Sequence, residues 1–107
     1  MSLTVYLTET HPVEVYENNI THNVGVMASS AGVYQALWRP EELDVKTARD
    51  LIPHLETGLN TLRENPPKYK ELNPKNGWGD YDSLCQFVRM YLIACIANPD
   101  ATVRASR

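Results

Sequence analysis

Three short segments alternate apolar and polar residues, the pattern of a half-buried strand. Residues 3–8 and residues 13–16 alternate in this way, and Thr10-His11-Pro12 lies between them as a turn. The two segments predict an antiparallel hairpin. Residues 102–106 alternate again near the C-terminus. Because a lone hairpin is marginal in water, we expect this third strand to complete a small sheet.

Between these ends the apolar residues recur at helical spacing. Residues 20–31, 48–62 and 84–95 each predict an amphipathic helix, and each is followed by helix-breaking glycine, asparagine or proline. The third helix is apolar on further faces as well, through Met90, Ile93 and Ile96. A helix that is apolar all round is usually buried, so we expect this one to be central. The fold class predicted is α+β, a three-stranded antiparallel sheet packed against three main helices.

Composition narrows the class of protein. A chain of 107 residues predicts a single domain with its own core, 1–107. The net charge of −3 argues against binding along extended nucleic acid, which usually needs a basic surface. We identify neither a signal peptide nor a membrane-spanning run, so we expect a cytoplasmic protein without a membrane partner. Cys85 and Cys95 lie about 15 Å apart along one predicted helix and cannot form a disulfide with each other.

The segment from residue 73 to residue 82 combines two glycines, a tryptophan and two aspartates just before the third helix. It predicts a rigid recognition loop in which Trp78 offers a stacking surface and Asn76 and Asp80 offer polar contacts. The alternative is that Trp78 closes the end of the core and Asp80 only caps the helix. Two carboxylates are too few for a calcium cage, so no metal site is predicted.

A second candidate segment is Leu37-Trp38-Arg39-Pro40-Glu41-Glu42. Proline followed by two glutamates suits the first turn of a short helix. The structural interpretation places Trp38 in the core and pairs Arg39 with a glutamate. The functional interpretation places Trp38 and Arg39 at the rim of a site, where the guanidinium group binds phosphate or carboxylate.

Three further features complete the candidate site. His22 and Asn23 lie where the first helix is predicted to begin, and helix N-termini attract anions; close helix packing is the alternative there. Arg89 lies in the most apolar helix and must reach solvent, form an ion pair or line a polar cavity. If the C-terminal strand pairs with the hairpin, Arg104 shares a sheet face with Tyr6 and Tyr16, a patch also suited to self-association.

No catalytic constellation is recognisable. The chain has no nucleophile elbow, no phosphate-binding P-loop and no pair of cysteine or histidine motifs with zinc spacing. A pairing of His22 with Asp80 or Asp82 for acid–base chemistry is not required by their spacing. We therefore lean towards a protein that is not an enzyme and assign no catalytic residue and no cofactor.

Several motifs resemble those of a group of short proteins encoded by bacteriophages and prophages. They are N-I-T-H-N at residues 19–23, Met27-Ala28, the segment Ala31–Tyr34, L-W-R-P-E-E at residues 37–42, N-G-W-G at residues 76–79 and the terminal V-R-A-S-R. The resemblance covers the chain from about residue 14 to its end. It implies a phage-derived accessory protein in the host cytoplasm, of a kind that often acts against host defence.

The leading functional hypothesis is a non-catalytic protein that binds a small nucleotide-like or anionic ligand. Its predicted ligand-binding residues are His22, Asn23, Trp38, Arg39, Asn76, Trp78, Asp80, Arg89 and Arg104. The alternative is an inhibitor that docks on a host enzyme or defence factor, since Trp, Tyr and Arg also dominate protein interfaces. The shape around Trp78 separates the two hypotheses: a concave pocket favours a ligand and a flat patch favours a protein.

Overall fold

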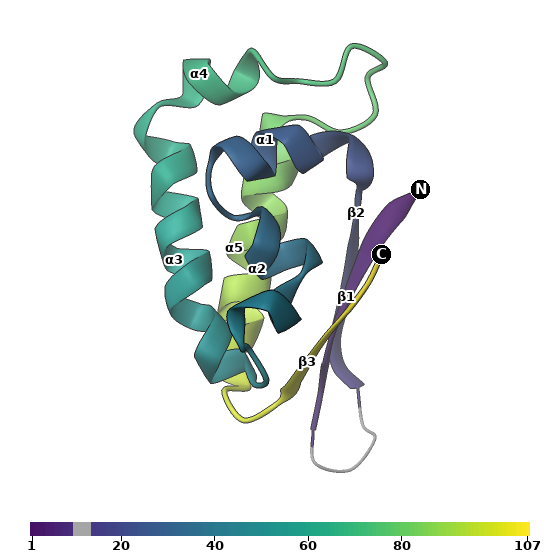
Figure 1. The fold of residues 1–107 in the computed structure, drawn as a ribbon, viewed down its shortest axis with the longest axis vertical. Coiled ribbons are helices and arrows are strands. Elements are labelled where there is room, and N and C mark those ends of the chain that lie inside the picture. The colour runs from purple at the N-terminus through teal and green to yellow at the C-terminus, as the bar shows by residue number, and fades with distance from the viewer. Residues whose placement is uncertain (10–13) are drawn as a thin grey trace.

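A three-stranded antiparallel sheet carries the helices on one of its faces (Figure 1). The computed structural model describes residues 1–9 and 14–107. The strands are β1 (Ser2–Thr8), β2 (Glu14–Thr21) and β3 (Thr102–Ser106), in the order β2-β1-β3. This confirms the predicted α+β fold, including the C-terminal strand. The turn predicted at Thr10-His11-Pro12, with Val13, lies outside the described residues.

The two faces of the sheet differ as the alternation in β1 predicts. Leu3, Val5 and Leu7 are fully buried beneath the helices. On the opposite face Tyr6 pairs with Glu17 of β2 on one side and Arg104 of β3 on the other. Among the described residues, no helix covers this second face (Figure 1).

The strand β2 is longer than the prediction. A helix was expected from residue 20, but β2 continues to Thr21 because Ile20 pairs with Leu3 and Thr21 with Ser2. The helical part that follows is short: a 3-10 turn, η1 (His22–Val24), and then α1 (Gly25–Ser30). Pairing along the whole of β1 therefore outweighs the low strand propensity of the two asparagines in β2.

The prediction that Tyr16 shares a face with Tyr6 is wrong. A register shift lies between Leu7 and Thr8, because Leu7 pairs with Tyr16 whereas Thr8 pairs with Glu14. The extra residue in β2 is a β-bulge, which breaks the simple alternation read from the sequence. Tyr16 consequently turns towards the helices and stacks on Tyr91, with ring centroids 5.8 Å apart.

The middle of the chain forms α2 (Tyr34–Trp38), the 3-10 helix η2 (Pro40–Leu43) and the long α3 (Ala48–Glu64). Thr47 and Asp50 form a capping box at the start of α3. The helix ends at the Asn65-Pro66 step, as predicted, but the prolines then begin a further short helix, α4 (Pro66–Lys70). Proline is favourable in the first turn of a helix, so the same residues end one helix and start the next.

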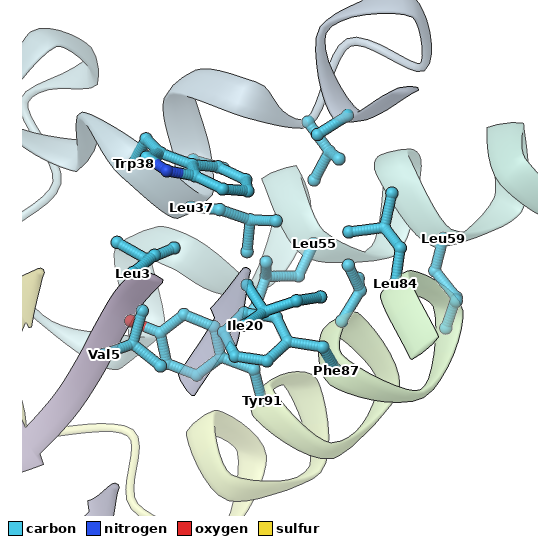
Figure 2. Packing of buried hydrophobic residues seen from close by; sticks show 14 of the residues in the cluster. Leu3, Val5, Ile20, Leu37, Trp38, Leu55, Leu59, Leu84, Phe87 and Tyr91 are labelled. Carbon is cyan, nitrogen blue, oxygen red and sulfur yellow. The ribbon is translucent and has the colours of Figure 1, made fainter. Parts of the chain in front are cut away.

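The last helix, α5 (Tyr81–Ala97), lies between the sheet and α3 (Figure 1). The inner face of the sheet and the facing sides of α3 and α5 form the core (Figure 2). The helix is central, as predicted, but it is not buried on every side, because Met90, Ile93 and Ile96 are 41%, 52% and 58% exposed. One side of α5 has no covering element among the described residues, and there Met90, Ile93 and Ile96 share the exposed surface with Asp82, Gln86 and Arg89.

Within the described part of the chain, no helix combines the length and the apolar character needed to cross a membrane.

Candidate functional site

The glycine–tryptophan loop, residues 73–80, is held in one conformation by its own side chains. The Tyr81 N–H donates to Asn73 Oδ1 at 2.8 Å, and the Trp78 N–H donates to Asn76 Oδ1 at 3.0 Å. Gly79 has a φ of +87° and lies against Thr21. The loop is therefore a rigid support that fixes the position of Trp78 beside the end of β2.

Trp78 points into solvent rather than into the core. Its side chain is 71% exposed, which excludes the interpretation that it closes the end of the core. It borders an open depression of about 570 Å³, lined by Met1, Ser2, Asn19, Thr21, Asn23 and Trp78. The structure thus brings two of the predicted site residues, Asn23 and Trp78, to one place.

A second depression, of about 270 Å³, lies between β2 and α5. It is lined by Asn18, Asn19, Ile20, Ser83, Gln86, Phe87 and Met90. Asn19 lines both depressions, so they adjoin at this residue of the edge strand. Ile93 and Ile96 are also exposed on α5, beyond Met90, but they line neither depression, and exposed Arg89 lies one turn before Ile93 on the same side of the helix.

We call this surface the Trp78–Ile93 face. It comprises the residues that line the two depressions together with Ile93 and Ile96. No acidic or basic side chain lines either depression. The lining consists of amide, hydroxyl, aromatic and thioether side chains. This arrangement offers van der Waals contact and neutral hydrogen bonds, whereas it offers no cationic side chain for a phosphate.

His22 and Trp38 also meet, but in a different place and largely inside the protein. Their ring centroids are 6.1 Å apart, and Trp38 is only 2% exposed. Trp38 stacks on Tyr34, with centroids 5.1 Å apart. The His22 Nε2 atom is buried without a hydrogen-bond partner. Trp38 therefore serves the core, as the structural interpretation of its segment predicts.

The three predicted arginines lie apart from the Trp78 depression. Arg39 pairs with Glu42 at 3.6 Å, as expected for a helix start. Arg89 is exposed on α5, which confirms that its charge reaches solvent. Arg104 lies over the Tyr6 ring, 4.1 Å from its centroid, on the open face of the sheet. None of the three lines the depression beside Trp78.

Asp80 is the N-cap of α5. Its Oδ1 atom accepts the Ser83 N–H at 2.7 Å, which confirms the predicted capping role. This backbone hydrogen bond, together with the Ser83 hydroxyl, lowers the pKa of the Asp80 carboxyl from its ordinary value. Asp80 is therefore a permanent carboxylate near neutral pH and helps to fix the loop that presents Trp78.

The two cysteines are free thiols with little nucleophilic character. Burial raises the pKa of Cys95 to about 12, and burial also raises the pKa of Cys85. The thiolate is the reactive form of cysteine, so neither thiol is activated at neutral pH. Among residues 1–9 and 14–107, no three His, Cys, Asp or Glu side chains group closely enough to hold a metal ion.

The chain matches no protein-family model, no curated protein and no solved structure. The candidate site consequently rests on its own geometry.

The sequence did not identify Asn18, Asn19, Met90, Ile93 or Ile96 as site residues. The signal for the three apolar residues was present, since a helix that is apolar all round is either buried or docked on something else. Asn18 and Asn19 belong to the polar segment 18–23, which the sequence placed at the start of a helix; only the longer β2 places them at the sheet edge beside α5.

Proposed function

We propose that this chain is a non-catalytic protein that docks on another polypeptide through the Trp78–Ile93 face. The supporting observation is that exposed Trp78 and Met90 line two depressions that meet at Asn19, and that no acidic or basic side chain lines either depression. The cores of protein interfaces are depleted in charge and enriched in aromatic residues and methionine.

The exposure of these side chains is costly unless a partner covers them. Burying a large apolar side chain typically stabilises by about 1.5–3 kcal/mol, so an exposed row forgoes that stabilisation. Contiguous exposed apolar surface commonly marks an interaction site. Tryptophan is also one of the residue types most often found as a binding hot spot. Trp78 is fixed by Asn76 and Gly79 and is free to enter a partner.

The resemblance of the sequence to phage-encoded proteins specifies the class of docking partner that we propose. For a phage-derived chain, this partner is a protein of the infected bacterial cell, such as a host enzyme or a defence factor. An inhibitor of this kind acts by covering a surface and needs no catalytic group of its own.

Site-specific photo-crosslinking in cells tests the proposal. A benzophenone amino acid replaces Trp78 or Ile93, and the matched control carries it at Val26, which is 70% exposed on α1 outside both depressions. We expect protein adducts from positions 78 and 93 after irradiation and none above background from position 26. Equal adducts from all three positions, or no adducts at all, would contradict docking through this face.

A second candidate function is binding of a small nucleotide-like ligand beside Trp78. The volume of about 570 Å³, with an indole and the Asn19 and Asn23 amides around it, favours this candidate. Thermal denaturation with mono-, cyclic and dinucleotides tests it. A ligand at 100 times its dissociation constant adds about 2.7 kcal/mol and raises the midpoint by about 10–20 °C. An unchanged midpoint across the panel excludes a nucleotide at this site.

A further inference from the structure

The outer edge of β2 is open for pairing. In the order β2-β1-β3, β2 has a neighbouring strand on one side only, as far as the described residues extend. The His22 N–H donates to the Met1 carbonyl at 3.2 Å, where the β1–β2 pairing continues. Backbone groups alternate between the two sides of a strand in an antiparallel pair, so residues 18 and 20 also face β1 whereas residues 17, 19 and 21 face outwards. Such an edge is a template for another strand.

Asn19 shows this orientation directly. Its N–H donates to the Asn18 side chain at 2.9 Å instead of to a carbonyl of β1. A carbonyl group of an incoming strand can take the place of this side-chain acceptor, so the donor stays satisfied when another strand pairs with β2.

The two depressions lie on opposite faces of the sheet at this edge. Ser2 and Thr21 pair on the face opposite the buried Leu3–Ile20 pair, and they line the depression beside Trp78. Ile20 lies on the helix side and lines the other depression together with residues of α5. Since successive side chains of a strand point to opposite faces, one strand added beside β2 reaches both depressions.

Two carboxylates lie at the end of β2 away from Trp78. Glu17 pairs with Tyr6 and Glu14 pairs with Thr8, so the β-bulge brings both carboxylates to the outer face. Desolvation and the neighbouring Glu17 carboxylate raise the pKa of Glu14, and Arg104 of β3 opposes this rise only in part. This end of the edge therefore attracts a cationic side chain of a partner.

We propose that the docking partner adds an extended segment to the edge of β2 as a fourth, antiparallel strand. This inference rests on the proposed docking function and specifies how the partner is recognised. The strands of the sheet already pair antiparallel, and this kind of pairing is the more stable per residue. Backbone hydrogen bonds to residues 17, 19 and 21 supply affinity, and the depressions and the carboxylates supply specificity.

The positions of the depressions define the chemistry of this segment. Its first residue lies opposite Thr21, beside Trp78, and is apolar or aromatic. The residues opposite Ile20 and Asn18 point to the helix side and are apolar, because no charged side chain lines that depression. The residue opposite Glu17 is Lys or Arg. The segment thus carries its cation on the same face as the first residue, four residues and about 13 Å further on.

Mapping of photo-crosslinks tests whether one strand occupies both depressions. The benzophenone amino acid replaces Trp78 in one variant and Met90, at the other depression, in the second. Mass spectrometry then locates each attachment site in the partner. We expect both sites within one segment no longer than a strand, about 3–10 residues. Sites in separate segments of the partner would overturn strand addition.

Removal of one backbone donor tests the pairing itself. Asn19→Pro deletes the outward N–H, and proline is tolerated on the open side of an edge strand. Asn19→Ala is the matched control, since it loses the same side chain and keeps the N–H. We expect Asn19→Pro to lower the adduct yield from position 78 by about tenfold relative to Asn19→Ala, because the partner's carbonyl loses its donor. Equal yields from the two variants would overturn the proposal.

Charge variants test the same recognition with the backbone intact. Glu17→Lys places a cation opposite the expected cation of the partner. Glu56→Lys makes the same change of charge at an exposed position on α3. We expect Glu17→Lys to lower the adduct yield from position 78 by about threefold or more and Glu56→Lys to leave it unchanged. Equal yields would contradict the expected cation. Unchanged circular dichroism of each variant shows that the fold is retained.

Failure of this inference is distinguishable from failure of the docking function. Adducts from position 78 that persist in Asn19→Pro and map to separate segments overturn strand addition and leave docking intact. Adducts made only of two copies of this chain overturn the separate partner. A yield from position 78 that never exceeds that from position 26 overturns both proposals.

Discussion

Gly79 lies so close to Thr21 that a Cβ atom on the glycine would meet Thr21 Cγ2 at 2.5 Å. The contact joins the glycine–tryptophan loop to the end of β2, two segments almost sixty residues apart in the sequence. Together with the φ of +87°, it explains why glycine is required there. The position of Trp78 depends on this contact.

Replacing Gly79 with alanine should therefore destabilise the fold and displace the loop. The left-handed backbone alone costs about 1–2 kcal/mol, and the contact with Thr21 raises the total to about 2–4 kcal/mol. Gly77→Ala is the matched control, because Gly77 has a φ of +77° but open space around it. Urea denaturation of both variants measures the difference. Equal losses of unfolding free energy would show that the contact with Thr21 contributes nothing.

The fluorescence of the two tryptophans should differ in its sensitivity to a quencher dissolved in the solvent. Trp78 is exposed and Trp38 is buried against Tyr34. Acrylamide should quench the fluorescence of the Trp38→Phe variant, which retains Trp78, several-fold more steeply than that of the Trp78→Phe variant. Similar quenching of the two variants would contradict the exposed position of Trp78.

Truncation of the same residues should separate docking from folding. Trp78→Ala removes an exposed side chain and should change the unfolding free energy by no more than about 0.5 kcal/mol. Trp38→Ala opens a cavity in the core and should cost about 3–5 kcal/mol. Chemical denaturation measures both values. A large loss for Trp78→Ala would mean that the residue supports the fold rather than a partner.

Local patterns were sufficient to predict most of the fold. The alternation in residues 3–8 and 102–106 gave two strands, and Asp80 and the Asn65-Pro66 step marked helix ends. These signals act over a few residues, because capping and strand alternation depend on neighbouring groups.

The candidate site depended on contacts that local patterns do not contain. The bulge beside Tyr16 is set by the pairing of β2 with β1, and the exposure of Ile93 by which sides of α5 are covered. The predicted arginines shared a chemistry but not a location, since Arg39, Arg89 and Arg104 belong to three different elements. Only the fold could show that Asn19 joins the two depressions.

Tyr91 carries a buried hydroxyl group without a hydrogen-bond partner, so its removal should be tolerated. Tyr91→Phe keeps the ring contacts with Tyr16 and Phe87 and should leave stability unchanged or raise it by about 1–2 kcal/mol. The matched control is Tyr81→Phe. That change removes the bond from the Tyr81 hydroxyl to the Leu62 carbonyl, 2.7 Å long, and should cost about 1–2 kcal/mol. A greater loss for Tyr91→Phe than for Tyr81→Phe would contradict this assignment.

The buried tyrosine hydroxyl and cysteine thiol groups should make the fold less stable at high pH. Burial raises the pKa of Tyr91 well above its ordinary value of 10, and burial raises the pKa values of Tyr81 and Cys95 to about 12. In the unfolded chain these groups lose their protons near pH 9–10, whereas in the folded chain they hold them. The unfolded state therefore gains free energy from ionisation first, and stability that is complete below about pH 9 falls as the pH rises towards 12. Each group contributes a slope of up to about 1.4 kcal/mol per pH unit.

Urea midpoints measured at pH 7, 9, 10 and 11 should decline in the last two steps, and the midpoint of Tyr91→Phe should decline less steeply than that of the wild type. A midpoint that is constant to pH 11 would show that these three side chains ionise equally in both states and are not buried as described.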